Sequence, residues 1–156
     1  MKYIVLAVVI ALAIFYFTRN ANNKKAAVDN IAVGIDFLAK NKANEDVLET
    51  TSGLQYQILQ KGEGNVHPSA SSTVKVHYHG LLLDGTVFDS SVDRGQPIIF
   101  PLNRVIKGWT EGVQLMVVGD KFKFFIPSEL GYGNSGTGKI TPGSLLVFEV
   151  ELLEIQ

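Results

Sequence analysis

Residues 74–91 begin with Val74-Lys75-Val76-His77-Tyr78-His79-Gly80, pass through three leucines, and end with Asp84-Gly85-Thr86-Val87-Phe88-Asp89-Ser90-Ser91. In the first part, two valines and a tyrosine alternate with a lysine and two histidines, which is typical of a strand with one apolar and one wet face. The Asp84-Gly85 pair lies between two apolar runs and predicts a hairpin turn. We therefore expect two antiparallel strands joined at this turn.

Outward from this hairpin, the pattern predicts more strands and a single helix. Residues 53–58 alternate with period two, and residues 121–126 and 145–155 also read as strands. Residues 101–116 carry Val105, Ile106, Trp109 and Val113 at roughly helical spacing, with Gly108 and Gly112 allowing close approach to a sheet. This order predicts an α+β fold: an antiparallel sheet wrapped around one short helix, preceded by an N-terminal hydrophobic helix.

The composition narrows the class of protein. The 156 residues allow one ordinary domain plus an appendage, and the 46% hydrophobic content is enough to fill a core. The net charge is −1 and no basic tract stands out, which argues against nucleic acid as a partner. The chain has no cysteine, so disulfides, thiol catalysis and cysteine-bound metals are excluded.

Residues 3–17 form an unbroken apolar run between Lys2 and Arg19. A cleaved signal peptide and an uncleaved single-span anchor both fit such a run. We favour the anchor, with membrane contact through residues 3–18, because Phe15, Tyr16 and Phe17 make a poor cleavage site. Three basic residues follow the run, so the positive-inside rule leans towards a cytoplasmic C-terminal side.

We expect residues 1–19 to form the anchor or signal segment, 20–50 a linker and 51–156 the main domain. Within the linker, residues 20–27 read as a polar tether. Val28, Ile31, Ile35 and Leu38 then recur at helical spacing and predict a short amphipathic helix over about residues 28–40. We expect this helix to pack on the domain or the membrane surface. It spans fewer than two heptads, so a dimer seam is disfavoured and a monomer is expected.

Several chemical classes are disfavoured by the motifs. No Gly-x-Ser-x-Gly elbow frames Ser90 or Ser91, so we interpret them as turn residues. His77 and His79 share a strand face but lack an evident third metal ligand, and a solvated face is the favoured interpretation. The glycine-rich residues 131–138 lack the Lys-Ser/Thr of a phosphate loop and read as a rim loop. No metal or cofactor is expected.

An aromatic and aliphatic set remains, and it forms either an ordinary core or a pocket: Tyr78, Phe88, Ile98, Trp109 and Phe148. Asp89 favours a pocket, because a partly buried carboxylate requires a partner. Arg94 is the natural candidate, and the Tyr78 hydroxyl is a second donor.

In this order, residues 74–80, 84–91, 105–109, 131–133 and 146–150 closely resemble the catalytic domain of FKBP-type peptidyl-prolyl isomerases, and the resemblance covers about residues 54–156. Residues 51–56 and 62–64 resemble the lead-in of the bacterial macrophage infectivity potentiator group. The resemblance implies the same α+β fold and acceleration of X–Pro isomerisation in proline-containing client chains. It also implies that macrolides are possible ligands. On orientation the resemblance leans against the positive-inside rule, and we follow it: with the anchor inferred above, we expect a single-pass protein of the bacterial inner membrane whose domain lies in the periplasm.

The resemblance also assigns roles to individual residues. It implies that Trp109 forms the floor of the pocket and that the Tyr132 hydroxyl, at the rim, donates a hydrogen bond to a substrate carbonyl. The Ile106 N–H would be a second donor, and Ile140 would be the aliphatic residue on the returning loop. It implies catalytic roles for Asp89, Tyr132, Tyr78, Phe88 and Trp109, and substrate binding by Ile98, Val105, Ile106, Ile140, Phe148 and Arg94. Ile98 stands where many relatives carry phenylalanine, which predicts a wider wall. The 133–142 loop is one residue short, with Thr137 near a histidine of some relatives.

Two other functions fit the same residues. A binding module or holdase would use the pocket for proline motifs without turnover. A purely structural anchor protein would bind no ligand, and the intact aromatic set argues against it.

Overall fold

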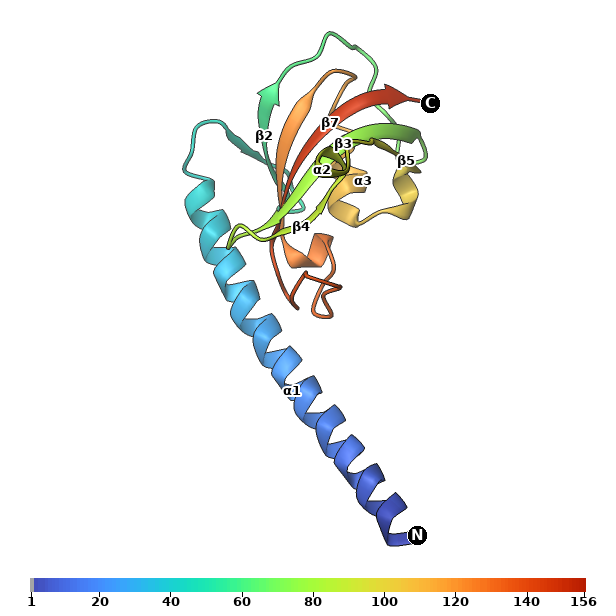
Figure 1. Cartoon of the computed structure of the whole chain (residues 1–156). Coiled ribbons are helices and arrows are strands. Elements are labelled where there is room, and N and C mark those ends of the chain that lie inside the picture. The colour runs from blue at the N-terminus through green and yellow to red at the C-terminus, as the bar shows by residue number, and fades with distance from the viewer. Residues whose placement is uncertain (1) are drawn as a thin grey trace.

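The computed structural model describes residues 2–156, with side chains from residue 4 onward, so Met1 of the predicted anchor lies outside the described residues (Figure 1). One long helix comes first and is followed by a curved sheet, with the short helix α3 (Lys107–Val113) against its concave face. In order, the elements are α1 (Lys2–Asn41), β1 (Val47–Glu49), β2 (Gln55–Gln60), β3 (Thr73–Leu82), β4 (Val87–Ser90), α2 (Ser91–Arg94), β5 (Ile98–Pro101), η1 (Leu102–Arg104), α3 (Lys107–Val113), β6 (Lys121–Ile126), η2 (Ser128–Leu130) and β7 (Leu146–Ile155).

The seven strands form one antiparallel sheet in the order β1-β2-β6-β7-β3-β4, with β5 also paired to β3. The predicted hairpin lies between β3 and β4, where Gly85 adopts a φ of 87° and its N–H donates to the Leu82 carbonyl at 3.0 Å. The predicted α+β architecture is confirmed. Strand β1 was not anticipated, because its three residues lie in a polar segment and the predicted linker therefore contributes to the sheet.

The predicted central helix exists but is shorter than 101–116. Phe100 and Pro101 pair with β3 as part of β5, and η1 separates that strand from α3. As predicted, the glycines of α3 bring it close to the sheet: an added Cβ would lie 2.6 Å from an Ile126 side-chain atom at Gly108 and 2.6 Å from the Phe124 ring at Gly112. The concave sheet face and α3 therefore enclose the main core.

Helix α1 is continuous, so the predicted tether at 20–27 and the separate short helix are wrong. The polar residues there are compatible with a helix, and no proline or glycine interrupts the helix before Gly34. An ion pair four residues apart, Lys25 Nζ to Asp29 Oδ2 at 2.9 Å, lies on the solvent side of this segment. The polar stretch is therefore a solvated helical face rather than a flexible connection.

The predicted apolar stripe of this helix is only half correct. Val28 and Ile35 are 66% and 64% exposed, whereas Phe37 and Leu38 pack against Phe125, Leu145 and Val147 on the sheet face opposite α3. Ile31 of the predicted stripe is also partly buried, and the remaining positions of the docked face are small or polar, namely Ala27, Asn30, Gly34 and Asn41. The docked face is rotated from the predicted stripe because it combines the packing of Phe37 and Leu38 with close approach at the small residues Ala27 and Gly34.

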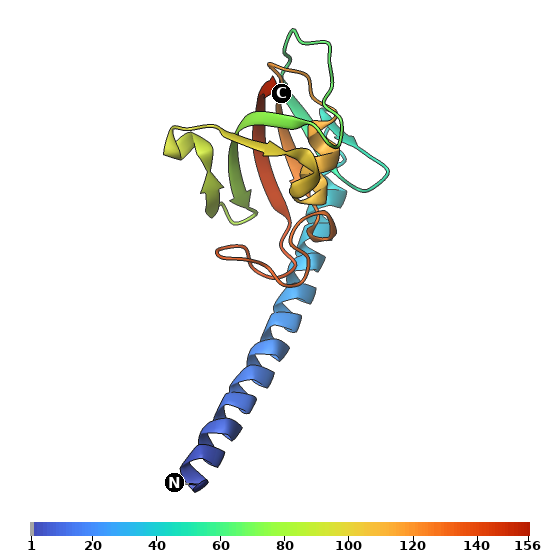
Figure 2. The ribbon, with the colours of Figure 1, turned by 90° about the vertical axis from the view of Figure 1, so that its right-hand side faces the viewer.

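The N-terminal half of α1 projects away from the domain (Figure 2). Large apolar side chains from Ile4 to Phe17 are at least half exposed. By length and composition, the helix is apolar enough to cross a membrane.

Candidate functional site

A cavity of about 720 Å³ opens between α3, the β4–β5 side of the sheet and the 131–145 loop. The structure brings ten of the eleven predicted site residues together in its lining: Tyr78, Phe88, Asp89, Ile98, Val105, Ile106, Trp109, Tyr132, Ile140 and Phe148. Arg94, the eleventh, does not line the cavity but bonds to two residues that do.

Trp109 lies at the floor, where only 5% of its surface is exposed. Helix α3 carries it, and the Gly108 contact with Ile126 holds it against the sheet. Its ring meets Tyr78 and Phe148 in edge-to-face geometry, with centroids 5.3 and 5.2 Å apart. Among the described residues, the buried Trp109 Nε1–H has no hydrogen-bond partner.

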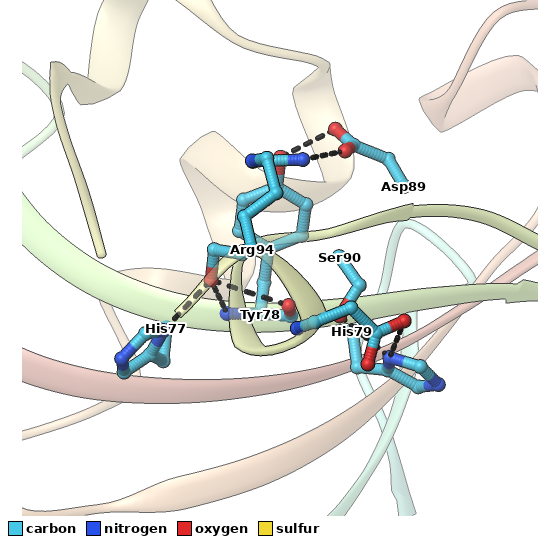
Figure 3. Close-up of polar contacts among 8 residues, drawn as sticks. His77, Tyr78, His79, Asp89, Ser90 and Arg94 are labelled. Atoms are coloured by element: carbon cyan, nitrogen blue, oxygen red, sulfur yellow. Dashed lines mark hydrogen bonds and ion pairs between the residues drawn. The ribbon is translucent and has the colours of Figure 1, made fainter. Parts of the chain in front are cut away.

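A polar group closes one edge of this apolar cavity (Figure 3). The Tyr78 hydroxyl donates to Asp89 Oδ2, and Arg94 Nη1 donates to Asp89 Oδ1. Arg94 Nη2 also donates to the Tyr78 oxygen at 2.9 Å, while the guanidinium lies 5.7 Å from the centre of the Tyr78 ring. The expected pairing of Asp89 with Arg94 and Tyr78 is therefore present in the structure.

These contacts fix the charge state of the edge. Burial alone would raise the pKa of Asp89, but the hydrogen bonds from Tyr78 and Arg94 and the Arg94 charge outweigh it, and the pKa lies below its usual value. Burial and then the bond to Asp89 raise the pKa of Tyr78. The edge therefore carries an ionised carboxylate and a neutral phenol at neutral pH.

Helix α2 places Arg94 over this edge. Ser90 caps the helix by accepting from the Asp93 N–H at 3.1 Å, which agrees with the turn role expected for the two serines. His77 Nδ1 lies 2.9 Å from the Ser91 hydroxyl, and His79 Nδ1 lies 2.8 Å from the Ser90 hydroxyl. The two histidines thus connect β3 to α2 through serines.

The 131–145 loop forms the opposite rim. Tyr132 is 43% exposed at the mouth, whereas Ile140 is buried and faces the cavity. The N–H of Thr137 donates to the Ile140 carbonyl at 2.9 Å, and the reverse bond measures 2.8 Å. These two backbone hydrogen bonds form an isolated antiparallel bridge within the loop, which fixes Ile140 relative to Thr137.

Five further lining residues were missed from the sequence: Phe100, Arg104, Thr137, Gly138 and Lys139. Thr137 was noted only as a departure from relatives. Phe100 lies two residues after Ile98 on β5 and its ring is 5.4 Å from that of Trp109. Strand alternation predicts that two such residues share a face, so Phe100 was detectable. Arg104 ends the single turn of η1 and the other three lie on the 131–145 loop, where no period indicates the direction of a side chain.

Comparisons with known protein families agree with this geometry. The FKBP-type peptidyl-prolyl cis-trans isomerase family matches residues 64–153, and the domain amino terminal to FKBP-type peptidyl-prolyl isomerase matches residues 9–58. The chain therefore belongs to the FKBP-type peptidyl-prolyl cis-trans isomerase family.

Particular relatives can also be named. The FkpA isomerase of Aeromonas hydrophila is 58% identical over 136 residues, which cover 87% of this chain and 50% of that protein. The outer membrane protein MIP of Legionella longbeachae is 42% identical over 139 residues, covering 88% and 59%, which confirms the resemblance to the macrophage infectivity potentiator group. The crystal structure of FkpA from Escherichia coli superimposes with a TM-score of 0.92 at 40% identity, covering 98% of this chain and 71% of that one. The chain spans about half of the FkpA relatives it matches.

Proposed function

We propose that this chain is a peptidyl-prolyl cis-trans isomerase acting on X–Pro bonds of unfolded or partly folded polypeptides. The observation that carries the proposal is an apolar, aromatic cavity over Trp109 with one ionised, fully partnered carboxylate at its edge. Membership of the isomerase family supports it.

The reaction requires a cavity of this kind. An X–Pro bond rotates over a barrier of about 18–20 kcal/mol because the planar amide is stabilised by resonance. The planar form is more polar than the twisted transition state, so apolar walls disfavour the planar form. A thousandfold acceleration requires about 4 kcal/mol of differential stabilisation. No covalent bond breaks, so no nucleophile is needed.

The lining residues have distinct roles in this proposal. The proline ring sits on Trp109, between Phe88 and Phe148. The Tyr132 hydroxyl and the Ile106 N–H bind backbone carbonyls of the substrate. Asp89 contacts the substrate next to the twisting amide, and Arg94 keeps Asp89 ionised. Macrolide ligands of the family are expected to compete for the same cavity.

The activity is tested with the full chain in detergent micelles by following cis-to-trans relaxation of a proline tetrapeptide. We expect a relaxation rate that rises in proportion to protein concentration. Binding of the peptide without acceleration, read from Trp109 fluorescence, would instead identify a binding module or holdase. Neither binding nor acceleration would indicate a structural anchor protein.

We further propose a monomer held by a single N-terminal span in a bacterial inner membrane, with the cavity on the periplasmic side. The exposed apolar half of α1 supports the span, and the match to FkpA and MIP supports the compartment. Residues 51–156 form the isomerase domain, extended by β1 through its pairing with β2. Protease added to intact spheroplasts is expected to cleave the domain, whereas protection until lysis would place it in the cytoplasm.

A further inference from the structure

The rim loop of the cavity rests directly on helix α1. Asn30 Nδ2 donates to the Pro142 carbonyl at 2.8 Å and lies 3.2 Å from the Thr141 hydroxyl oxygen. Thr141 Oγ1 is in turn 2.6 Å from Ser144 Oγ. The polar side chain of a helix residue therefore holds the end of a loop that lies far away in sequence.

The backbones meet at the same place. Gly143 has a φ of +73°, and a Cβ there would lie 2.4 Å from the Ala27 carbonyl oxygen. Further along α1, a Cβ on Gly34 would lie 3.3 Å from Leu145 Cβ. Glycine at 143 permits both the left-handed backbone and the close contact with α1.

Hydrogen bonds connect this contact to the cavity. The Gly143 N–H donates to the Gly133 carbonyl at 2.9 Å, which joins the two ends of the loop. Tyr132 immediately precedes Gly133, and Ile140 immediately precedes Thr141. Tyr132, which binds substrate in the proposed function, and Ile140, which lines the cavity, are therefore each adjacent to a residue of the anchored base.

We propose that Asn30 is a positioning residue of the active site, and that α1 holds the rim loop in its substrate-binding conformation. Helix α1 is thus part of the isomerase apparatus as well as its connection to the N-terminal apolar segment. The expected effect of Asn30 on the kinetics of isomerisation rests on the proposed isomerase function.

Docking of the helix itself does not depend on Asn30. Phe37 packs on Phe125 with centroids 5.7 Å apart, and Asn41 Nδ2 donates to Gln55 Oε1 at 2.9 Å. These contacts lie about two to three turns further along α1. Removing the Asn30 amide therefore leaves the helix on the sheet and changes the loop alone.

The test compares Asn30→Asp with Asn22→Asp in the 156-residue chain in detergent micelles. Both changes add one negative charge to α1, but only Asn30 contacts the loop, and the carboxylate introduced at position 30 cannot donate to the Pro142 carbonyl. For Asn30→Asp we expect KM to rise about three- to tenfold with kcat nearly unchanged, because the loop binds ground and transition states alike. Asn22→Asp is expected to match the unmodified chain.

Amide hydrogen exchange gives a second readout. In Asn30→Asp, exchange at the N–H groups of Ile140 and Gly143 is expected to accelerate, while the β6 amides stay protected. Unchanged KM together with unchanged exchange would overturn the proposal. If the unmodified chain itself shows no acceleration, the proposed function fails. In that case the positioning role is tested by binding instead. It would be overturned if Asn30→Asp and Asn22→Asp had the same affinity for a proline peptide and the same amide exchange in the loop.

Discussion

The Tyr78 hydroxyl donates a hydrogen bond to the Asp89 carboxylate between neighbouring strands β3 and β4. Asp89 is nearly half exposed, so it adds little to stability as a surface charge. Asp89 lies at the cavity edge, where the proposed function has it contact the substrate. Arg94 holds both partners and completes a three-residue unit that depends on the α2 turn.

Replacing Asp89 tests this unit. Asp89→Asn keeps the shape but removes the charge, leaving Arg94 without its anion. We expect kcat/KM for a proline tetrapeptide to fall about three- to tenfold, because a charge-assisted contact is lost at a partly hydrated site. Asp46→Asn, in the turn before β1, is the control and is expected to retain full activity. Equal rates for the two variants would remove Asp89 from the proposed mechanism.

The same contacts predict the response of this edge to pH. The lowered pKa of Asp89 means that its ion pair stabilises the folded chain above about pH 4 and is lost as pH falls through the folded-state value. The raised pKa of Tyr78 keeps the phenol neutral beyond about pH 10. We expect neither group to change charge between about pH 5 and 9. An inflection of kcat/KM in that range that disappears in Asp89→Asn would contradict this expectation.

Packing of α3 on the sheet predicts a stability effect. In Gly112→Ala, the new Cβ would lie 2.6 Å from the buried Phe124 ring, and overpacking of this kind costs about 1–3 kcal/mol. Gly53→Ala provides a comparison, since its Cβ would meet nothing within 4 Å and only the positive φ of 89° is strained. Denaturant unfolding of both variants separates crowding from backbone strain. A smaller loss for Gly112→Ala than for Gly53→Ala would show that Phe124 moves aside easily.

The mouth of the cavity is expected to select substrates by charge. Arg104 and Lys139 line it, and neither forms an ion pair with any residue in the described part of the chain, while Asp89 is neutralised by Arg94. We expect a glutamate next to the proline to give about threefold higher kcat/KM than a lysine there, with the difference vanishing in about 1 M salt. The variant with Arg104→Gln and Lys139→Gln is expected to lose the preference, and Lys61→Gln to keep it. A preference unaffected by salt would indicate a different cause.

The sheet and most of the cavity were predictable because their signals are local. Each signal indicates one local geometry. Alternation in residues 74–78 indicates a strand, the Asp84-Gly85 pair indicates a hairpin turn, and the glycines of α3 indicate close approach to a sheet. The docked face of α1 was not predictable in this way. Hydrophobic periodicity included the exposed Val28 and Ile35, whereas the closest approaches of the helix to the domain are made at Ala27 and Gly34, which are small and carry no apolar signal.

The continuity of α1 was also hidden by composition. Residues 20–27 are polar apart from three alanines and show no apolar period, a pattern that predicts a flexible connection. A helix that is exposed to solvent on every side has the same polar composition as a flexible linker. Only the absence of helix-breaking residues distinguishes such a helix from a linker. Arg104, at the end of η1, and Lys139, on the 131–145 loop, were missed for a different reason, since the direction of their side chains depends on the tertiary path of the chain.

An unbroken helix has a mechanical consequence for an enzyme held at a bilayer. The roughly ten residues from Phe17 to Ala27 rise about 15 Å, so the domain stands at a set height above the end of the apolar run. A flexible linker of about ten residues would instead give a root-mean-square reach of about 16–19 Å in any direction. On the proposed membrane placement, the stiff helix allows the domain to swivel about the anchor but not to explore depth. The active site then stays at a nearly constant distance from the lipid surface. Its substrates are the polypeptides that reach this distance from the bilayer.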